Sequence, residues 1–89
     1  MTEVPGITQI RETLGKVSET ERRIETGEAT QEEVIERAEE LAEARRISHH
    51  LSSNMVIVPA KLNKELYAAL PRLLRRAFTT FLTPTPTGR

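Results

Sequence analysis

The chain has 89 residues, 37% hydrophobic and 3% aromatic, and its 13 basic and 13 acidic side chains balance to a formal net charge of zero. It contains no cysteine, which excludes disulfides and thiolate metal sites. A chain of this length forms one small domain that buries a modest fraction of its surface. We therefore expect part of its stability to come from a second copy or from another protein chain.

The zero net charge hides an uneven distribution along the chain. Residues 1–54 carry 12 acidic and 7 basic side chains, a net charge of −5, whereas residues 55–89 carry one acidic and 6 basic side chains, a net charge of +5. This pattern indicates either that an acidic half packs on a basic half or that the basic segment binds an anionic partner.

Residues 7–26 are predicted to form the first helix. Its apolar positions follow a 3-4-3-7 spacing that fits heptad a and d sites, which is typical of a helix that pairs with another helix. Glu21 takes the one a site that lacks an apolar residue. The positions of this stripe are Ile7, Ile10, Leu14, Val17 and Ile24. Gly27 is expected to end the helix.

Residues 30–51 are predicted to form the second helix. Thr30 and Glu33 have the spacing of a capping box, which marks a helix start. The apolar stripe of this helix consists of Val34, Ile35, Ala38, Leu41 and Ala42. The link over residues 27–29 is so short that the two helices are expected to form an antiparallel helical hairpin.

The second half of the chain is predicted to contain a short extended segment and a basic amphipathic helix. Residues 55–58 form an apolar, mostly β-branched run that stops at Pro59, which favours a short strand or a linker. Residues 60–82 return to a helical pattern, and Pro71 is expected to kink this helix or to split it in two. The predicted fold is therefore all-α: a helical hairpin, an extended segment and a kinked or split C-terminal amphipathic helix.

We expect a single helical domain over residues 1–82, followed by a mobile tail over residues 83–89, where threonine and proline alternate. No run approaches the roughly 18 apolar residues that a membrane-spanning helix needs. The first residues also lack the basic and apolar regions of a secretory signal. These features predict a cytoplasmic protein, or a virion-internal one if it is phage-encoded.

No catalytic, metal or cofactor site is expected. Adjacent residues of a helix point about 100° apart, so His49 and His50 do not hold one metal ion together. The nearby serines have no glycine-rich elbow and no carboxylate behind a histidine, and the glycines are isolated rather than grouped in a phosphate-binding loop. We therefore predict a non-enzymatic protein with no cofactor and no small-molecule substrate.

The predicted function is that of a structural or interaction module, which self-associates or serves as an accessory subunit of a larger protein assembly. Its apolar stripes supply the predicted interface with the partner. The residues of this interface are Ile10, Leu14, Val17, Val34, Ala38, Leu41, Leu66, Leu70, Leu73, Leu74, Phe78 and Phe81.

A basic cluster on the C-terminal helix supports an alternative function. Its members are Lys61, Lys64, Arg72, Arg75 and Arg76. Three partners fit this cluster: the glutamates of the second helix, in the same chain or in a neighbouring copy; the phosphates of a nucleic acid; and, less favoured, an anionic membrane surface. The first partner explains the uneven charge distribution without a further molecule, whereas the second makes the chain a small nucleic-acid-binding regulator.

Overall fold

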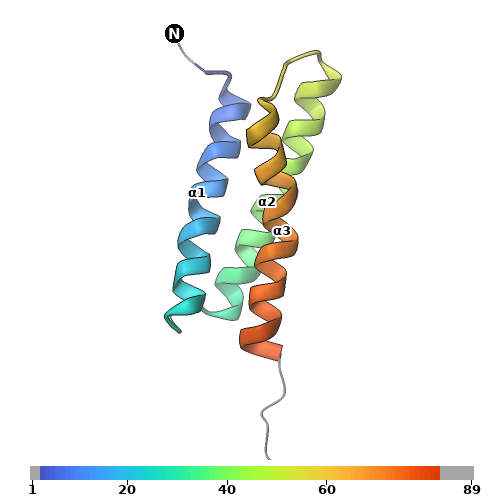
Figure 1. Cartoon of the computed structure of the whole chain (residues 1–89). Coiled ribbons are helices and arrows are strands. Elements are labelled where there is room, and N and C mark those ends of the chain that lie inside the picture. The colour runs from blue at the N-terminus through green and yellow to red at the C-terminus, as the bar shows by residue number, and fades with distance from the viewer. Residues whose placement is uncertain (1–2, 83–89) are drawn as a thin grey trace, which may run out of the picture.

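A computed structural model of the chain describes residues 3–82 and is helical along most of that length (Figure 1). The helices are α1 (Pro5–Glu25), α2 (Gln31–Ser53) and α3 (Ala60–Ala77), and a short π-helical segment, η1 (Phe78–Leu82), continues α3. Residues 3–82 contain no strand. The predicted all-α class is confirmed, whereas the predicted tail over residues 83–89 lies outside the described residues.

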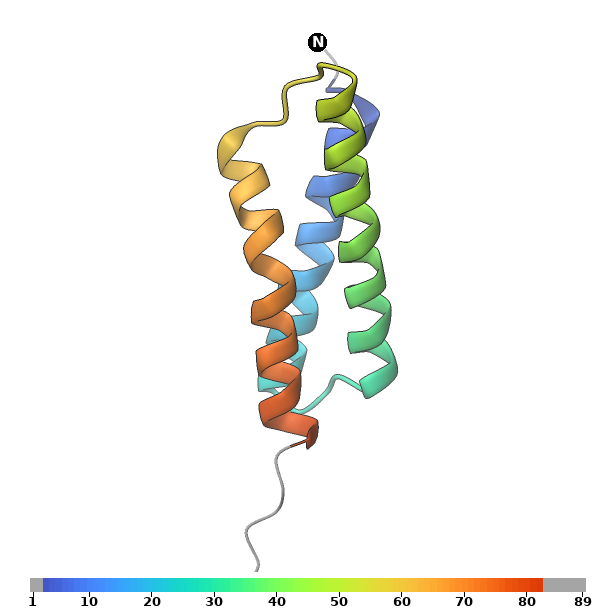
Figure 2. The ribbon, with the colours of Figure 1, turned by 90° about the vertical axis from the view of Figure 1, so that its right-hand side faces the viewer.

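The three helices pack side by side as an up-down-up bundle. α1 and α2 run antiparallel, and α3 returns along both of them, as the two perpendicular views in Figures 1 and 2 show. Each helix contacts both of the others. The sequence-based prediction of a hairpin followed by a C-terminal amphipathic helix did not say where that helix packs; in the structure, α3 makes up one third of a common bundle.

The chain leaves α1 through a glycine turn. The N–H of Glu28 donates to the carbonyl of Arg23 (2.8 Å), and the N–H of Gly27 donates to the carbonyl of Ile24 (3.2 Å). These two bonds define a Schellman motif, which requires a left-handed residue just after the helix. Gly27 has a φ of 79° and meets this requirement without steric cost. The predicted helix end at Gly27 is confirmed.

α2 begins with half of the predicted capping box. The side-chain oxygen of Thr30 accepts a hydrogen bond from the N–H of Glu33 (3.2 Å), as the pattern predicts. The Glu33 carboxylate, however, does not complete the box. It accepts a bond from Nε of Arg23 on α1 (3.0 Å) instead. The same residue thus helps to cap α2 through its backbone and to hold α1 through its side chain.

The predicted extended segment begins as a turn. Met55 has a φ of 63°, its N–H donates to the carbonyl of Ser52 (3.0 Å), and the N–H of Val56 donates to the carbonyl of Leu51 (2.8 Å). This is the same motif as at the end of α1, with methionine in the position that glycine prefers. Residues 56–59 then link α2 to α3 without forming a strand.

Pro71 neither splits nor ends α3, which runs from Ala60 to Ala77. Proline has no N–H to donate to the carbonyl four residues earlier, which belongs to Tyr67. Pro71 and Tyr67 are both exposed, so that this carbonyl lies where water can take the role of the missing donor. The helix changes to π geometry later, at Phe78.

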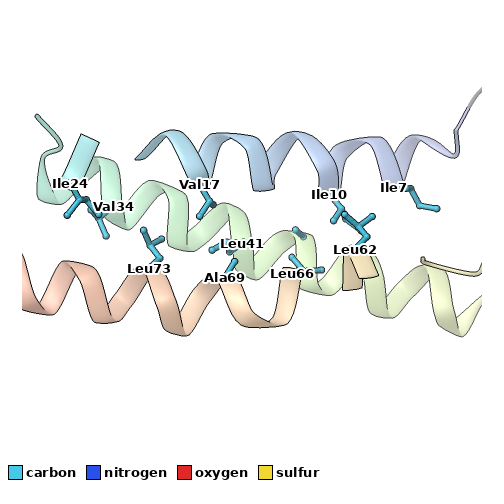
Figure 3. Packing of buried hydrophobic residues seen from close by; sticks show 11 residues of the cluster. Ile7, Ile10, Val17, Ile24, Val34, Leu41, Leu62, Leu66, Ala69 and Leu73 are labelled. Atoms are coloured by element: carbon cyan, nitrogen blue, oxygen red, sulfur yellow. The ribbon is translucent and has the colours of Figure 1, made fainter. Parts of the chain in front are cut away.

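The core lies along the axis of the bundle. Figure 3 shows its side chains pointing toward one another from all three helices. They are Ile7, Ile10, Val17 and Ile24 of α1; Val34, Leu41 and Ala44 of α2; and Leu62, Leu66, Ala69 and Leu73 of α3. α2 contributes three of these side chains, fewer than either of its neighbours. Its buried Ser48 hydroxyl donates to Oδ1 of Asn63 on α3 (2.7 Å).

Gly6 brings the start of α1 close to the end of α2. A Cβ atom at this position would lie 3.1 Å from Cγ2 of Ile47 and 3.1 Å from Cδ1 of Leu51. Both distances are shorter than ordinary van der Waals contact, so a larger residue would displace these two side chains.

Candidate interaction surface

The structure places half of the predicted interface residues inside the bundle. None of these six is more than 5% exposed, and all of them contact the chain's own core. They are Ile10, Val17, Val34, Leu41, Leu66 and Leu73. In this fold, the three narrow stripes of the helices face one another, and of these residues only Val34 borders the surface, at the floor of a groove described below.

The other predicted interface residues lie at the edge of the core or on the surface. Leu14, Ala38, Leu70 and Phe81 are half-buried and pack against the core from outside. Leu74 and Phe78 are 39% and 57% exposed. Both belong to the end of the molecule where α3 and η1 lie beside the start of α2.

An apolar groove occupies this end of the α2/α3 face, by which we mean the surface where α2 and α3 lie side by side away from α1. The groove has a volume of about 260 Å³. It is lined by Gln31, Val34, Ile35, Leu74, Ala77, Phe78 and Phe81. Ile35 is the most exposed of its apolar side chains, at 58%. The groove thus presents aliphatic and aromatic carbon to solvent, with a single uncharged polar side chain in its lining.

A cationic patch occupies the opposite end of the same face. The Arg45 guanidinium lies over the ring of Tyr67, 4.7 Å from its centroid, which is a cation–π contact. This patch is lined by Arg45, Arg46, His49, His50 and Tyr67. The structure thus groups the histidines with the arginines of α2, whereas the sequence-based prediction placed the functional cations on the C-terminal helix.

A second stripe on α2 connects the apolar groove to the cationic patch. Its residues are Ile35, Ala38, Ala42, Arg45 and His49, and their 3-4-3-4 spacing keeps them on one side of the helix. This spacing is the signal in the sequence that relates the cationic patch to the groove. Ala38 and Ala42 are half-buried in the middle of the stripe, where their small side chains leave the α2 backbone open to close approach.

Two arginines of the predicted basic cluster form ion pairs with α1. Nε of Arg72 donates to the Glu21 carboxylate (2.8 Å), and Arg76 pairs with Glu25 and lies 3.9 Å from Glu21. One of the predicted partners of the basic cluster was a set of acidic side chains in the same chain. The helix that provides it is α1, however, and not the second helix with Glu36, Glu39 and Glu43.

The remaining members of the basic cluster are Lys61, Lys64 and Arg75. They are exposed and form no ion pair with any residue in the range 3–82. Arg45 of the cationic patch also lacks an ion pair within this range. These four cations are therefore available to an anion from another molecule.

The boundary between α1 and α2 is also closed by polar contacts. Thr20 is buried; its hydroxyl donates to Glu33 (3.1 Å) and accepts from Nε of Arg37 (3.1 Å). Lys16 and Glu40 form a further ion pair across this boundary (3.8 Å). The hydrogen bond from Arg23, helped by the one from Thr20, lowers the pKa of Glu33 below its usual 4.5. The carboxylate therefore remains charged at neutral pH.

A polar hollow of about 670 Å³ lies over α1 and α2, where Glu3, Glu12, Glu40, Glu43 and Lys16 contribute charged side chains. Within the described part of the chain, no group of three or more histidine, aspartate, glutamate or cysteine residues is arranged to hold a metal ion. Over the same residues, no helix combines the length and the apolar character that crossing a bilayer requires.

Comparison with known proteins finds no match: no protein-family model, no curated protein and no solved structure is significantly similar to this chain.

Proposed function

We propose that the chain is a non-enzymatic interaction module that self-associates or serves as an accessory subunit of a larger protein assembly, through its α2/α3 face. The observation that supports this proposal is the apolar groove, where Ile35 and Leu74 remain exposed beside the aromatic ring of Phe78. Contiguous exposed apolar surface on a small protein typically marks a site of association.

The contrast between the three helix boundaries adds to this argument. Ion pairs cross from α1 to α2 and from α1 to α3. Among residues 3–82, none crosses from α2 to α3. Covering a half-exposed isoleucine, leucine or phenylalanine contributes about 1 kcal/mol. Burial of the groove on both partners would therefore contribute several kcal/mol to association.

The test measures the solution mass of the purified chain by analytical ultracentrifugation over a wide concentration range. We expect a defined oligomer, and we expect Ile35→Ser combined with Leu74→Ser to weaken it while helical content is retained. Ile57→Ser is the matched control, because Ile57 is 87% exposed in the linker, outside the groove. The proposal is wrong if two results are both negative: the wild-type chain forms no oligomer, and it captures no protein subunit that the double variant fails to capture.

A second candidate function is the binding of nucleic-acid phosphates, which the unpaired cations Arg45, Lys64 and Arg75 support, together with the adjacent ring of Tyr67. This function predicts a mobility shift of duplex DNA at low salt, which weakens steeply as salt is raised. Lys64→Glu combined with Arg75→Glu should remove the shift. Without a shift by the wild-type chain at low salt, this candidate is eliminated.

A further inference from the structure

The distribution of charge along the α2/α3 face indicates what covers it. We propose that the occupant is a second copy of the chain, packed in antiparallel orientation about a two-fold axis near Ala38 and Ala42. The apolar groove of each copy then lies on the cationic patch of the other. This inference rests on the proposed function and adds to it the identity and the orientation of the partner.

The charges of α2 that lack an ion pair differ between the two ends of the helix. Glu32 lies near the start of α2 and Glu39 near its middle, and neither forms an ion pair with any of residues 3–82. Arg45 lies in the second half without an ion pair, beside the two histidines, whereas its neighbour Arg46 is paired with Glu43 (2.5 Å). An antiparallel second copy brings Glu32 of each copy toward Arg45 of the other, whereas a parallel copy places like charges opposite each other. Charge complementarity therefore selects the antiparallel arrangement.

The middle of the second stripe is suited to a symmetry axis. An antiparallel helix centred between Ala38 and Ala42 places Ala38 of one copy opposite Ala42 of the other. Ile35 then lies opposite Arg45 of the second copy, because both positions are equally far from the centre. Small side chains at the point of closest approach allow two helices to pack with a short interaxial distance.

The two ends of the face complement each other in chemistry as well as in charge. The aliphatic stems of arginine side chains and the ring of tyrosine cover apolar surface while their polar ends remain in water. The Arg45–Tyr67 pair thus provides a cover for Ile35 and Leu74 of the second copy. Because the contact is two-fold, both grooves are buried by one interface and no further surface is left for a third copy.

Charge reversal in the two halves of α2 provides the test. One variant carries Glu32→Lys and Glu39→Lys, which replaces the unpaired acidic side chains of α2 with basic ones. The other carries Arg45→Glu and Arg46→Glu, which replaces the two arginines near the end of α2 with acidic side chains. We expect each variant alone to dimerise at least about tenfold more weakly than wild type, because like charges meet in both halves. An equimolar mixture should form a heterodimer of restored affinity.

The control variant carries Glu12→Lys and Glu28→Lys, the same change in net charge at exposed positions outside the α2/α3 face. It should dimerise like wild type. Association is measured by analytical ultracentrifugation at low salt, and the mixed species by native mass spectrometry. Circular dichroism checks helical content, and the single changes Glu39→Lys and Arg45→Glu replace any double variant that loses it.

The possible outcomes separate this inference from the proposed function. If wild type dimerises but either reversed variant dimerises equally well, or if the mixture restores nothing, the antiparallel arrangement is wrong while self-association stands. If the wild-type chain stays monomeric and instead binds a helical protein partner or DNA, the second copy is not the occupant. A heterodimer that forms only from the two oppositely reversed variants supports the inference.

Discussion

The boundaries that α1 makes with its neighbours differ from the boundary between α2 and α3. Where α1 meets the other helices, ion pairs such as Glu21–Arg72 and Arg23–Glu33 lie outside the apolar core and close its edges. Along the α2/α3 face, apolar side chains remain exposed at one end, and Arg45 lies at the other without an ion pair to any of residues 3–82. The comparison teaches that, within the helices, the exposed large apolar side chains lie on the face that no ion pair among these residues crosses: Ile35, Tyr67, Leu74 and Phe78, apart from Met55 and Ile57 in the linker and Val4 before α1.

The largest expected effect is on the free energy of unfolding, and it should differ between two leucines of α3. Leu66 is fully buried among the three helices, whereas Leu74 lines the apolar groove. Leu66→Ala should lower the free energy of unfolding by about 3 kcal/mol, because it removes buried methyl groups and leaves a cavity. Leu74→Ala should lower it by less than about 1 kcal/mol while weakening self-association. Urea denaturation at low protein concentration measures the free energy of unfolding of both variants. An equal decrease in the two would contradict the assignment of Leu66 to the core and of Leu74 to the α2/α3 face.

A smaller effect is expected at the boundary between α1 and α3. Glu21 is mostly buried and accepts the hydrogen bond of Arg72. Glu21→Ala should cost about 1–2 kcal/mol of unfolding free energy, because it leaves the half-buried Arg72 without its partner, while Arg76 keeps Glu25. The control is Glu39→Ala, since Glu39 is exposed and forms no ion pair within residues 3–82. A change of similar size in both variants would show that the α1/α3 ion pairs do not stabilise the fold.

The two turns of the bundle offer a third comparison. The turn after α1 has glycine in the left-handed position, and the turn after α2 has Met55 there, with its side chain exposed. Met55→Gly should therefore raise the free energy of unfolding by about 1 kcal/mol, because a residue with a Cβ atom is strained in this conformation. Ser53→Gly, in the last turn of α2, should lower it instead. Thermal and urea unfolding measure the stability of the two variants. If Met55→Gly destabilises the chain, Met55 is not strained in its left-handed conformation.

The smallest effect concerns the dependence of stability on acid. Hydrogen bonds from Arg23 and Thr20 lower the pKa of Glu33 in the folded chain, so its charged form stabilises the fold above its usual pKa of 4.5. This contribution is lost as the pH falls through the lowered pKa. In urea denaturation between pH 7 and pH 3, Glu33→Gln should flatten the acid side of the profile relative to wild type. An unchanged slope would mean that Glu33 has the same pKa in the folded and unfolded chain.

The helix ends were predictable from the sequence because a few neighbouring residues determine them. Gly27 and Thr30 act where the sequence pattern places them. The sequence left open whether Pro71 kinks the helix or splits it, because the effect of a proline depends on whether the unpaired carbonyl faces solvent or the core, and the structure shows no split. The left-handed Met55 carries no signal at all, since methionine is a poor residue for that conformation.

The way in which the helices share their faces was not predictable in the same manner. Ala44 and Ser48 are buried because α2 packs between two neighbours, yet neither residue stands out in a pattern of large apolar side chains. The candidate site shows the same limit. Leu74 and Phe78 were predicted and lie on the surface, but Leu66 and Leu73 of the same helix do not. Which residues remain exposed depends on the position of the third helix, and this is a tertiary property.

The charges around α1 have a consequence for the handedness of the bundle. Three apolar stripes can close a core whether α3 lies on one side of the α1–α2 pair or on the mirror-image side. In the mirror arrangement, the flank of α3 that carries Arg72 and Arg76 would turn away from Glu21 and Glu25, and these four charges would lose their partners. The ion pairs thus discriminate between two topologies that the apolar core alone accepts equally.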